Sequence, residues 1–481
     1  MNQLITIPYA CKFLSDFIDI LPTHVLLNKG VTGCGGTTLE LKAPRNSIIL
    51  CPTKNLVENK SKYGCAVTGD TKNSTIDTYL KTSSIKYKKI IATYDSLERL
   101  MKLIPDYQNY FLLVDEYHLL FNDYSFRTDI ILYILKHFRE FNNWCFLTAT
   151  PIKSEFILNE LSNIDTITYK WEAAIPVYTK IIDTYFIQKE LLKLIDYYAP
   201  TRNLHIFINS ITTIRNITKH TNNYSYRIVC SEHQKRIKSD GINSEVKKLN
   251  FYTSCAFEGC DIYDKNGLCI IICDTNIATT ILDISTKIRQ ICGRLRDSKY
   301  KDECVIILNS SKHRYANTPV QKFIQKVNES EQLGKVKEES LQHCSPIQMA
   351  AELKLYNKET YSNLYLNKFK DKIFYDVNLK KLDIYNYHLI SEIYSNTISV
   401  ISELKHNNFI PKKESISLSN NFITIKEGAY TYEQLKTLYE PVLNKLHIKW
   451  TNRVIKTYFP THTITQKKVN RKNVKYYIFK S

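Results

Sequence analysis

The 481-residue sequence predicts an α/β protein with two tandem domains built on parallel sheets, then a helical region and a small basic domain. Short apolar runs that end in polar residues alternate with helix-length polar stretches, once between residues 24 and 150 and again between residues 177 and 308. The composition, 43% hydrophobic and 23% charged, is ordinary for a folded core. It excludes disorder, collagen and coiled coil as overall descriptions.

The chain is basic, with 66 Lys and Arg against 47 Asp and Glu and a formal net charge of +19. Such an excess favours a polyanionic partner, either nucleic acid or an anionic membrane surface. No apolar run approaches the roughly 20 residues that span a bilayer, and residues 1–11 lack the features of a signal peptide. We therefore expect no membrane insertion and a nucleic-acid partner.

The thirteen cysteines are an odd number without the spacing of a disulfide framework. Two pairs, Cys255 with Cys260 and Cys269 with Cys273, are spaced like metal ligands, but no further cysteine or histidine motif accompanies them. We interpret them as thiols of the core. Reduced thiols predict a cytoplasmic protein, in the host cytoplasm if the protein is viral.

A glycine-rich loop is the first chemical feature of the chain. Four of the twelve glycines fall between Gly30 and Gly36, after the strand-like run His24–Leu27 and before a predicted helix start at Thr37. Glycine lets a backbone close on a ligand, and backbone N–H groups at a strand–loop–helix junction bind phosphate. A structural turn is the alternative for the loop alone. The residues predicted to bind a nucleotide here are Gly30, Gly33, Cys34, Gly35, Gly36, Thr37 and Thr38.

The loop fits the phosphate-binding pattern G-x-x-x-x-G-K-[ST] at every specified position except one. Gly36 stands where the lysine belongs, while Thr37 keeps the hydroxyl that would hold Mg²⁺. Lys29, just before the loop, and Lys54, after the next strand, are two candidates for the missing cation. The sequence leaves that choice open.

The following apolar runs predict the strands of two parallel sheets. Polar residues at the ends of the strands should meet at one edge, where open α/β sheets bind ligands. Helices are predicted over Ser96–Leu103 and Phe126–Asn142. The predicted strands of the first domain are Ser47–Cys51, Lys89–Thr93, Tyr110–Val114 and Trp144–Thr148. Those of the second domain, which begins near Val177, are Leu204–Ile208, Arg227–Cys230, Lys248–Phe251, Leu268–Ile272 and Cys304–Leu308.

Two acidic residues, Asp115 and Glu116, follow one of these strands directly. A carboxylate at such a position can hold the Mg²⁺ of a nucleotide, and its neighbour can polarise the attacking water. A solvated acidic loop is the alternative. Because the pair lies at the end of a buried-type strand and downstream of the glycine loop, we favour the catalytic interpretation.

The second domain contributes glycines and arginines in two polar segments. Gly259 and Gly293 are two of the eight glycines outside the loop, and Arg294 and Arg296 follow closely. Arginine stabilises the charge on a transferring phosphate. Taken singly, these arginines would more often be surface ion-pair partners.

The order of these motifs resembles a superfamily-two DExH-box helicase with a degenerate Walker A loop. The resemblance covers about residues 24–310 and implies two RecA-like domains. The last motif ends in Gly293-Arg294-Leu295-Arg296, a G-R-x-R form that is more similar to helicases of viral or mobile-element replication. The matching segments are the glycine loop, Cys51–Lys54, Ala92–Leu97, Asp115–His118, Thr148–Thr150, Ile206–Ser210, Thr253–Asp261 and Gln290–Arg294.

The resemblance implies a role for each segment. Thr37 and Asp115 would hold Mg²⁺, Glu116 would activate water, and Thr148 and Thr150 would couple hydrolysis to domain movement. Arg294 would act as an arginine finger, with Arg296 as a second candidate. Gly259, Asp261 and Gln290 would face the nucleotide from the second domain. Nucleic-acid contacts would come from Pro52, Thr53, Lys54, Thr93, Tyr94, Asn209, Ser210 and Thr253.

The C-terminal third shows helical patterning, for example over Val320–Val327 and Ile390–Leu404, without recognisable chemistry. Beyond it, two helices at Tyr430–Leu446 and Trp450–Tyr458 and two strands at Thr461–Gln466 and Val474–Phe479 resemble a winged helix, with a solvated basic tail as the alternative. Interleaved rings and lysines predict nucleic-acid contact. The basic residues predicted to grip phosphates are Lys467, Lys468, Arg471 and Lys472.

We therefore predict an ATP- and Mg²⁺-dependent helicase or translocase that acts on single-stranded or forked nucleic acid, DNA rather than RNA, in replication or repair alongside replication proteins. The alternative is a catalytically inactive scaffold or origin-binding component, because Gly36 replaces the lysine. The predicted domains are residues 1–176 and 177–312 (RecA-like), 313–418 (helical) and 419–481 (winged-helix-like).

Overall fold

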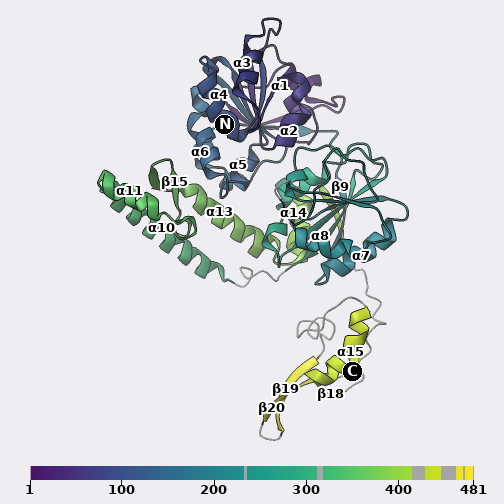
Figure 1. The fold of residues 1–481 in the computed structure, drawn as a ribbon. Coiled ribbons are helices and arrows are strands. Elements are labelled where there is room, and N and C mark those ends of the chain that lie inside the picture. Colours follow the sequence, from purple (N-terminus) through teal and green to yellow (C-terminus); the bar gives the residue numbers. More distant parts are fainter. Residues whose placement is uncertain are drawn as a thin grey trace.

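The computed structural model describes residues 2–231, 234, 236–310, 318–413, 428–445, 462–469 and 472–479. An eight-stranded sheet lies in residues 2–171, called lobe 1, and a seven-stranded sheet lies mainly in residues 177–309, called lobe 2. Figure 1 shows lobe 1 in purple and blue beside lobe 2 in teal, with helices around both sheets. The predicted class, two tandem RecA-like α/β domains followed by a helical region, is confirmed.

The sheet of lobe 1 has the order β1-β8-β2-β7-β6-β3-β5-β4, and all neighbouring strands are parallel. Its central strands are unbroken apolar runs because both faces are covered. The strands are β1 Asn2–Ile7, β2 Val25–Asn28, β3 Ser47–Cys51, β4 Cys65–Val67, β5 Lys89–Thr93, β6 Phe111–Asp115, β7 Asn143–Thr148 and β8 Thr166–Trp171. The helices are α1 Gly36–Lys42, α2 Lys54–Asn59, α3 Asn73–Lys81, α4 Leu97–Leu103, α5 His118–Asn122 and α6 Thr128–His137.

Register places three functional strand ends next to one another. Asn28 at the end of β2 pairs with Thr148 at the end of β7, and Asp115 at the end of β6 pairs with Leu147. The loop after β2 therefore opens beside the carboxylates that follow β6. This edge of lobe 1 faces lobe 2.

Lobe 2 has the order β11-β12-β10-β13-β14-β9-β17, again with every neighbouring pair parallel. The five predicted strands are present, and Cys269 and Cys273 lie buried within β13, as expected for core thiols. Its strands are β9 Val177–Asp183, β10 Asn203–Phe207, β11 Tyr226–Val229, β12 Leu249–Tyr252, β13 Gly267–Asp274 and β14 Glu303–Asn309, and its helices are α7 Ile187–Tyr198, α8 Ile211–Thr218, the π-helix Ile284–Ile288 and α9 Arg289–Cys292.

The predicted helical region, residues 313–418, also contains strands. Strand β17 (Phe409–Lys413) joins the edge of the sheet of lobe 2 beside β9, and a short hairpin interrupts the helices. The helix predicted over residues 390–404 is broken into a π-helix and α14. The elements are α10 Val320–Gln342, α11 Pro346–Leu355, α12 Lys358–Ser362, β15 Leu366–Phe369, β16 Lys372–Tyr375, α13 Val377–His388, the π-helix Leu389–Ile393 and α14 Thr397–His406.

Helix α13 contacts both lobes. At its start, Asp376 Oδ2 accepts a 2.8 Å hydrogen bond from the buried hydroxyl of Tyr124 in lobe 1. Further along, the hydroxyl of Tyr385 donates to Asp283 Oδ2 of lobe 2 at 2.7 Å. Helix α13 therefore bridges the lobes, and α10 and α11, green like α13 in Figure 1, lie beyond it.

The C-terminal segment forms its own antiparallel sheet, ordered β18-β20-β19. The predicted helix and the two predicted strands are present, while the helix predicted over residues 450–458 and Arg471 lie outside the described residues, as do the side chains of Lys467, Lys468 and Lys472. The bounds are β18 Gly428–Thr431, α15 Tyr432–Lys445, β19 His462–Val469 and β20 Lys472–Phe479. In the described part of the chain, no helix has the length and apolarity needed to cross a bilayer.

Candidate nucleotide site between the lobes

The glycine loop turns tightly between β2 and α1. Gly35 precedes α1 with φ of 85°, in the left-handed region that favours glycine. At Gly30 a Cβ atom would lie 2.2 Å from the carbonyl oxygen of Tyr169, so only glycine fits. Cys34 is buried and Thr38 half-buried in this turn. The loop can present backbone N–H groups to an anion, as the sequence predicts.

Thr37 and Asp115 meet at the mouth of the loop. The hydroxyl of Thr37 donates to Asp115 Oδ2 at 2.7 Å, and both residues are buried. A hydroxyl and a carboxylate are the protein ligands that Mg²⁺ takes when substrate phosphates complete its shell. This donor set fits the implied metal.

Tyr94 holds the backbone of the acidic pair in place. Its hydroxyl donates to the carbonyl oxygens of Asp115 at 2.5 Å and Glu116 at 3.2 Å, and the side chain is only 2% exposed. A ring buried in this way cannot stack on a base. The predicted nucleic-acid contact of Tyr94 does not fit, because its hydroxyl and ring serve the core instead.

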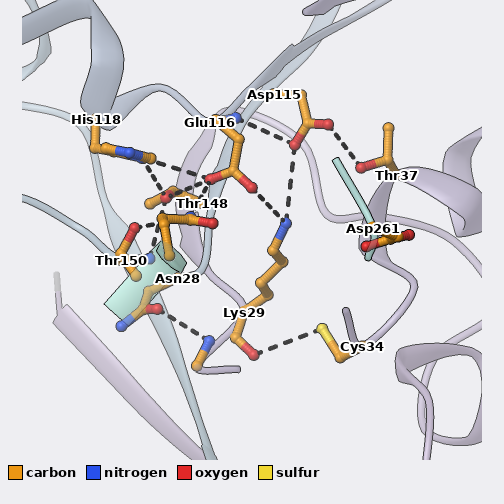
Figure 2. A network of polar contacts seen from close by, with 12 residues as sticks. Asn28, Lys29, Cys34, Thr37, Asp115, Glu116, His118, Thr148, Thr150 and Asp261 are labelled. Atoms are coloured by element: carbon orange, nitrogen blue, oxygen red, sulfur yellow. Dashed lines mark hydrogen bonds and ion pairs between the residues drawn. The ribbon is translucent and has the colours of Figure 1, made fainter. Parts of the chain in front are cut away.

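Lys29 is the cation nearest the two carboxylates among the ion pairs of this site. Its Nζ lies 3.3 Å from Glu116 Oε1 and 3.9 Å from Asp115 Oδ1 (Figure 2). Burial alone would lower the pKa of Lys29, but the two carboxylates outweigh it and raise that pKa. Lys54, the other predicted candidate, lies on α2 and pairs with Asp70 at 2.8 Å, with half its side chain exposed.

Glu116 is held by neighbours from three strand ends. Its Oε2 accepts a 3.1 Å bond from the hydroxyl of Thr148, which also lies 2.8 Å from His118 Nδ1 and accepts from the backbone N–H of Thr150. Burial favours the neutral acid, but the ammonium of Lys29, together with the nearby His118 and Arg294 and the bond from Thr148, outweighs it and holds the pKa of Glu116 below its usual value. Burial also lowers the pKa of His118 to about 4. At neutral pH the site thus holds an ionised glutamate beside a neutral imidazole.

Lobe 2 completes this network through Gln290. Its Nε2 donates to Glu116 Oε2 and to Thr150 Oγ1, both at 3.0 Å. Arg294 binds Gln290 in turn, through its side-chain oxygen at 2.8 Å and its backbone carbonyl at 2.8 Å, and donates to the carbonyl of Cys260. The predicted arginine finger therefore positions Gln290 here, because its bonds to Gln290 and Cys260 lie within lobe 2.

Other cations of lobe 2 lie against the glycine loop. A Cβ on Gly33 would lie 2.3 Å from the guanidinium of Arg296, which is held by Asp261 at 2.6 Å. Arg289 donates to the carbonyl of Gly30 at 3.0 Å. Arg296, the second candidate, therefore faces the loop. Arg289 was not among the predicted residues, although its place directly before Gln290 would have been the signal.

Gly259 of lobe 2 contacts helix α2 of lobe 1, away from the glycine loop. A Cβ there would lie 2.3 Å from Leu56 Cγ, and Asn59 Nδ2 donates to the carbonyl of Gly259 at 3.3 Å. Gly259 thus faces helix α2 rather than the glycine loop. Its φ of 76° and the contact with Leu56 explain the residue type.

The predicted nucleic-acid residues have local structural partners. Thr53 and Ser210 cap α2 and α8, and the carbonyl of Pro52 accepts from Arg127 at 3.0 Å. Asn209 bonds the backbones of Ser254 and Thr279, joining two loops at the edge of lobe 2. Thr93, which lies 3.0 Å from the Ser96 hydroxyl, and Thr253 are buried.

No protein-family model and no curated protein matches the chain. Solved helicase structures resemble it at low identity. S. cerevisiae Dbp5 bound to RNA and ADP BeF3 is 13% identical over 60% of this chain and 80% of that one, with a TM-score of 0.42. The Mycobacterium smegmatis helicase Lhr bound to ssDNA and AMP-PNP is 12% identical over 93% and 70%, with a TM-score of 0.43. The helicase domain of Pyrococcus furiosus Hef is 13% identical over 60% and 92%, with a TM-score of 0.34.

Proposed function

We propose that this protein is an ATP-dependent helicase or translocase that acts on single-stranded or forked DNA. The observation that carries the proposal is the bond between Gln290 of lobe 2 and Glu116 of lobe 1. A carboxylate positioned to activate water is thereby held by the lobe that must move. Hydrolysis and the relative position of the lobes would then change together.

The chemistry follows from the donors around the loop. The phosphates of ATP would lie on the glycine loop, and Mg²⁺ bound by Thr37 and Asp115 would offset their charge. Glu116 would orient the attacking water, because its lowered pKa keeps it an acceptor at neutral pH. Arg296 would face the developing charge from lobe 2.

The net charge of +19 supports binding to nucleic acid, and we propose that the strand lies across both lobes. Contacts to a single strand would be mainly to phosphates, so binding should weaken steeply with salt. We propose that Lys54, Asn209 and the basic C-terminal residues contribute to it.

The thirteen free cysteines suit a reducing, cytoplasmic compartment. A role in replication or repair, with replication proteins as partners, is part of this proposal.

The test is ATP turnover by the full chain, with and without single-stranded DNA or RNA. DNA should stimulate turnover, and Glu116→Gln should reduce it by about 100-fold or more, the usual size of a general-base effect. Glu98→Gln is the matched control, since Glu98 pairs with Lys102 on an exposed helix surface. Salt-sensitive DNA binding without any turnover would instead identify the inactive scaffold.

A further inference from the structure

We propose that Lys29 replaces the missing lysine of the phosphate-binding loop and binds the terminal phosphate of ATP. The proposal rests on the function proposed above. It assigns the role to a residue that lies before the loop, at the end of strand β2, instead of one that starts the following helix.

The backbone of Lys29 is fixed on three sides. Its N–H donates to the carbonyl of Thr148 at 2.8 Å, and its carbonyl accepts a 2.7 Å bond from Trp171 Nε1. The thiol of Cys34 lies 3.9 Å from the same carbonyl. The position from which the side chain enters the site is therefore set by the sheet and by the loop itself.

The stem of Lys29 passes Gly36. A Cβ built on Gly36 would lie 3.3 Å from Lys29 Cδ and 3.1 Å from Leu147 Cδ2. Both distances are tighter than ordinary van der Waals contact, so a long side chain at position 36 would compete with Lys29 for the same space. The glycine at the lysine position is thus explained by the lysine that arrives from position 29.

The ammonium group of Lys29 lies where a cation that binds the terminal phosphate is needed. With 6% of the residue exposed, its Nζ lies between the carboxylate that would hold Mg²⁺ and the one that would orient water, at 3.9 and 3.3 Å. Asp115 would share its charge with the Mg²⁺ that it holds, and Lys29 would then be able to turn to the phosphate. The ion pairs with Asp115 and Glu116 keep the cation in position.

The experiment compares four forms of the full chain by direct titration with MgATP and MgADP, and by DNA-stimulated turnover. They are the natural chain, Lys29→Ala, Gly36→Lys and the double variant. Losing a charged bond to phosphate should weaken MgATP binding by about 10- to 150-fold in Lys29→Ala, and MgADP binding by less. Gly36→Lys alone should also weaken it, because the two stems collide. The double variant should recover much of the loss, because the stem of Lys29 no longer fills that space.

Two further variants separate phosphate binding from folding. Lys29→Gln keeps part of the stem and a polar end without the charge, and it should lose MgATP affinity to the same extent. Lys89→Gln is the matched control, since Lys89 is also buried and pairs with Glu40 at 3.7 Å, away from the loop. It should lower stability while leaving MgATP affinity within twofold.

Two results would contradict the proposed role of Lys29. The inference is overturned if both Lys29 variants bind MgATP within twofold of the natural chain, or if Gly36→Lys alone raises affinity and turnover. The function fails separately, if DNA stimulates no turnover in the natural chain. The titrations with MgATP would still decide the role of Lys29 in that case.

Discussion

Gln290 makes the buried polar contact through which the two lobes can be uncoupled with one substitution. Gln290→Ala removes the 3.0 Å bonds from its amide to Glu116 and Thr150. Alanine suits the short helix α9, so the backbone of this segment should persist. Arg294 loses its bond to the side-chain oxygen and keeps those to two carbonyls.

The size of the effect follows from the two lost bonds. A buried hydrogen bond to a carboxylate contributes about 1.5–3 kcal/mol, and one to a neutral hydroxyl contributes about 1 kcal/mol. The closed arrangement of the lobes should therefore lose about 2.5–4 kcal/mol relative to an open one. At 1.4 kcal/mol per factor of ten, the ratio of closed to open molecules should fall by about 60- to 700-fold.

Energy transfer between dyes on the two lobes would measure that ratio. Tyr87 in lobe 1 and Tyr197 in lobe 2 are exposed and can be replaced by non-natural labelling residues, which avoids the thirteen free thiols. Asn59→Ala is the control, because it removes an exposed interlobe bond to the carbonyl of Gly259 and should cost less than about 1 kcal/mol. Equal opening by both variants, or no opening by Gln290→Ala, would refute the reasoning.

Two further predictions concern stability. Tyr124→Phe removes a buried bond to Asp376 and should lower the free energy of unfolding by about 1.5–3 kcal/mol in urea titrations. Tyr107→Phe is the control, because it loses a bond to the exposed Glu140 and should change the free energy of unfolding by less than about 1 kcal/mol. Similar losses in the two variants would contradict the role of burial. Burial raises the pKa of Glu258 to about 7 from 4.5, so the folded protein binds a proton that the unfolded chain lacks, and stability should fall as pH rises through this window, by up to about 3 kcal/mol. Glu258→Gln should flatten this decline in urea titrations from pH 5 to 8; an unchanged slope would show that other groups cause it.

The strands that carry the motifs were predictable because their signals are local. Ser47–Cys51 and Lys89–Thr93 agree with the observed strands residue for residue, since each is a compact apolar run bounded by polar residues. Strands β1, β4, β8, β9 and β17 were not predicted. Strands β1 and β17 lie at sheet edges with β8 and β9 beside them, and half-exposed residues break the apolar pattern in all four.

The partners within the site required the tertiary structure. The sequence alone determined that the glycine loop and the pair Asp115 and Glu116 follow apolar strands of one parallel sheet, because local polarity and strand periodicity encode this. It offered Lys29 and Lys54 equally, and Arg294 ahead of Arg296. Which cation turns inward depends on how elements far apart in the chain meet. Glu116 and Gln290 are 174 residues apart and touch only because two separate lobes pack against each other.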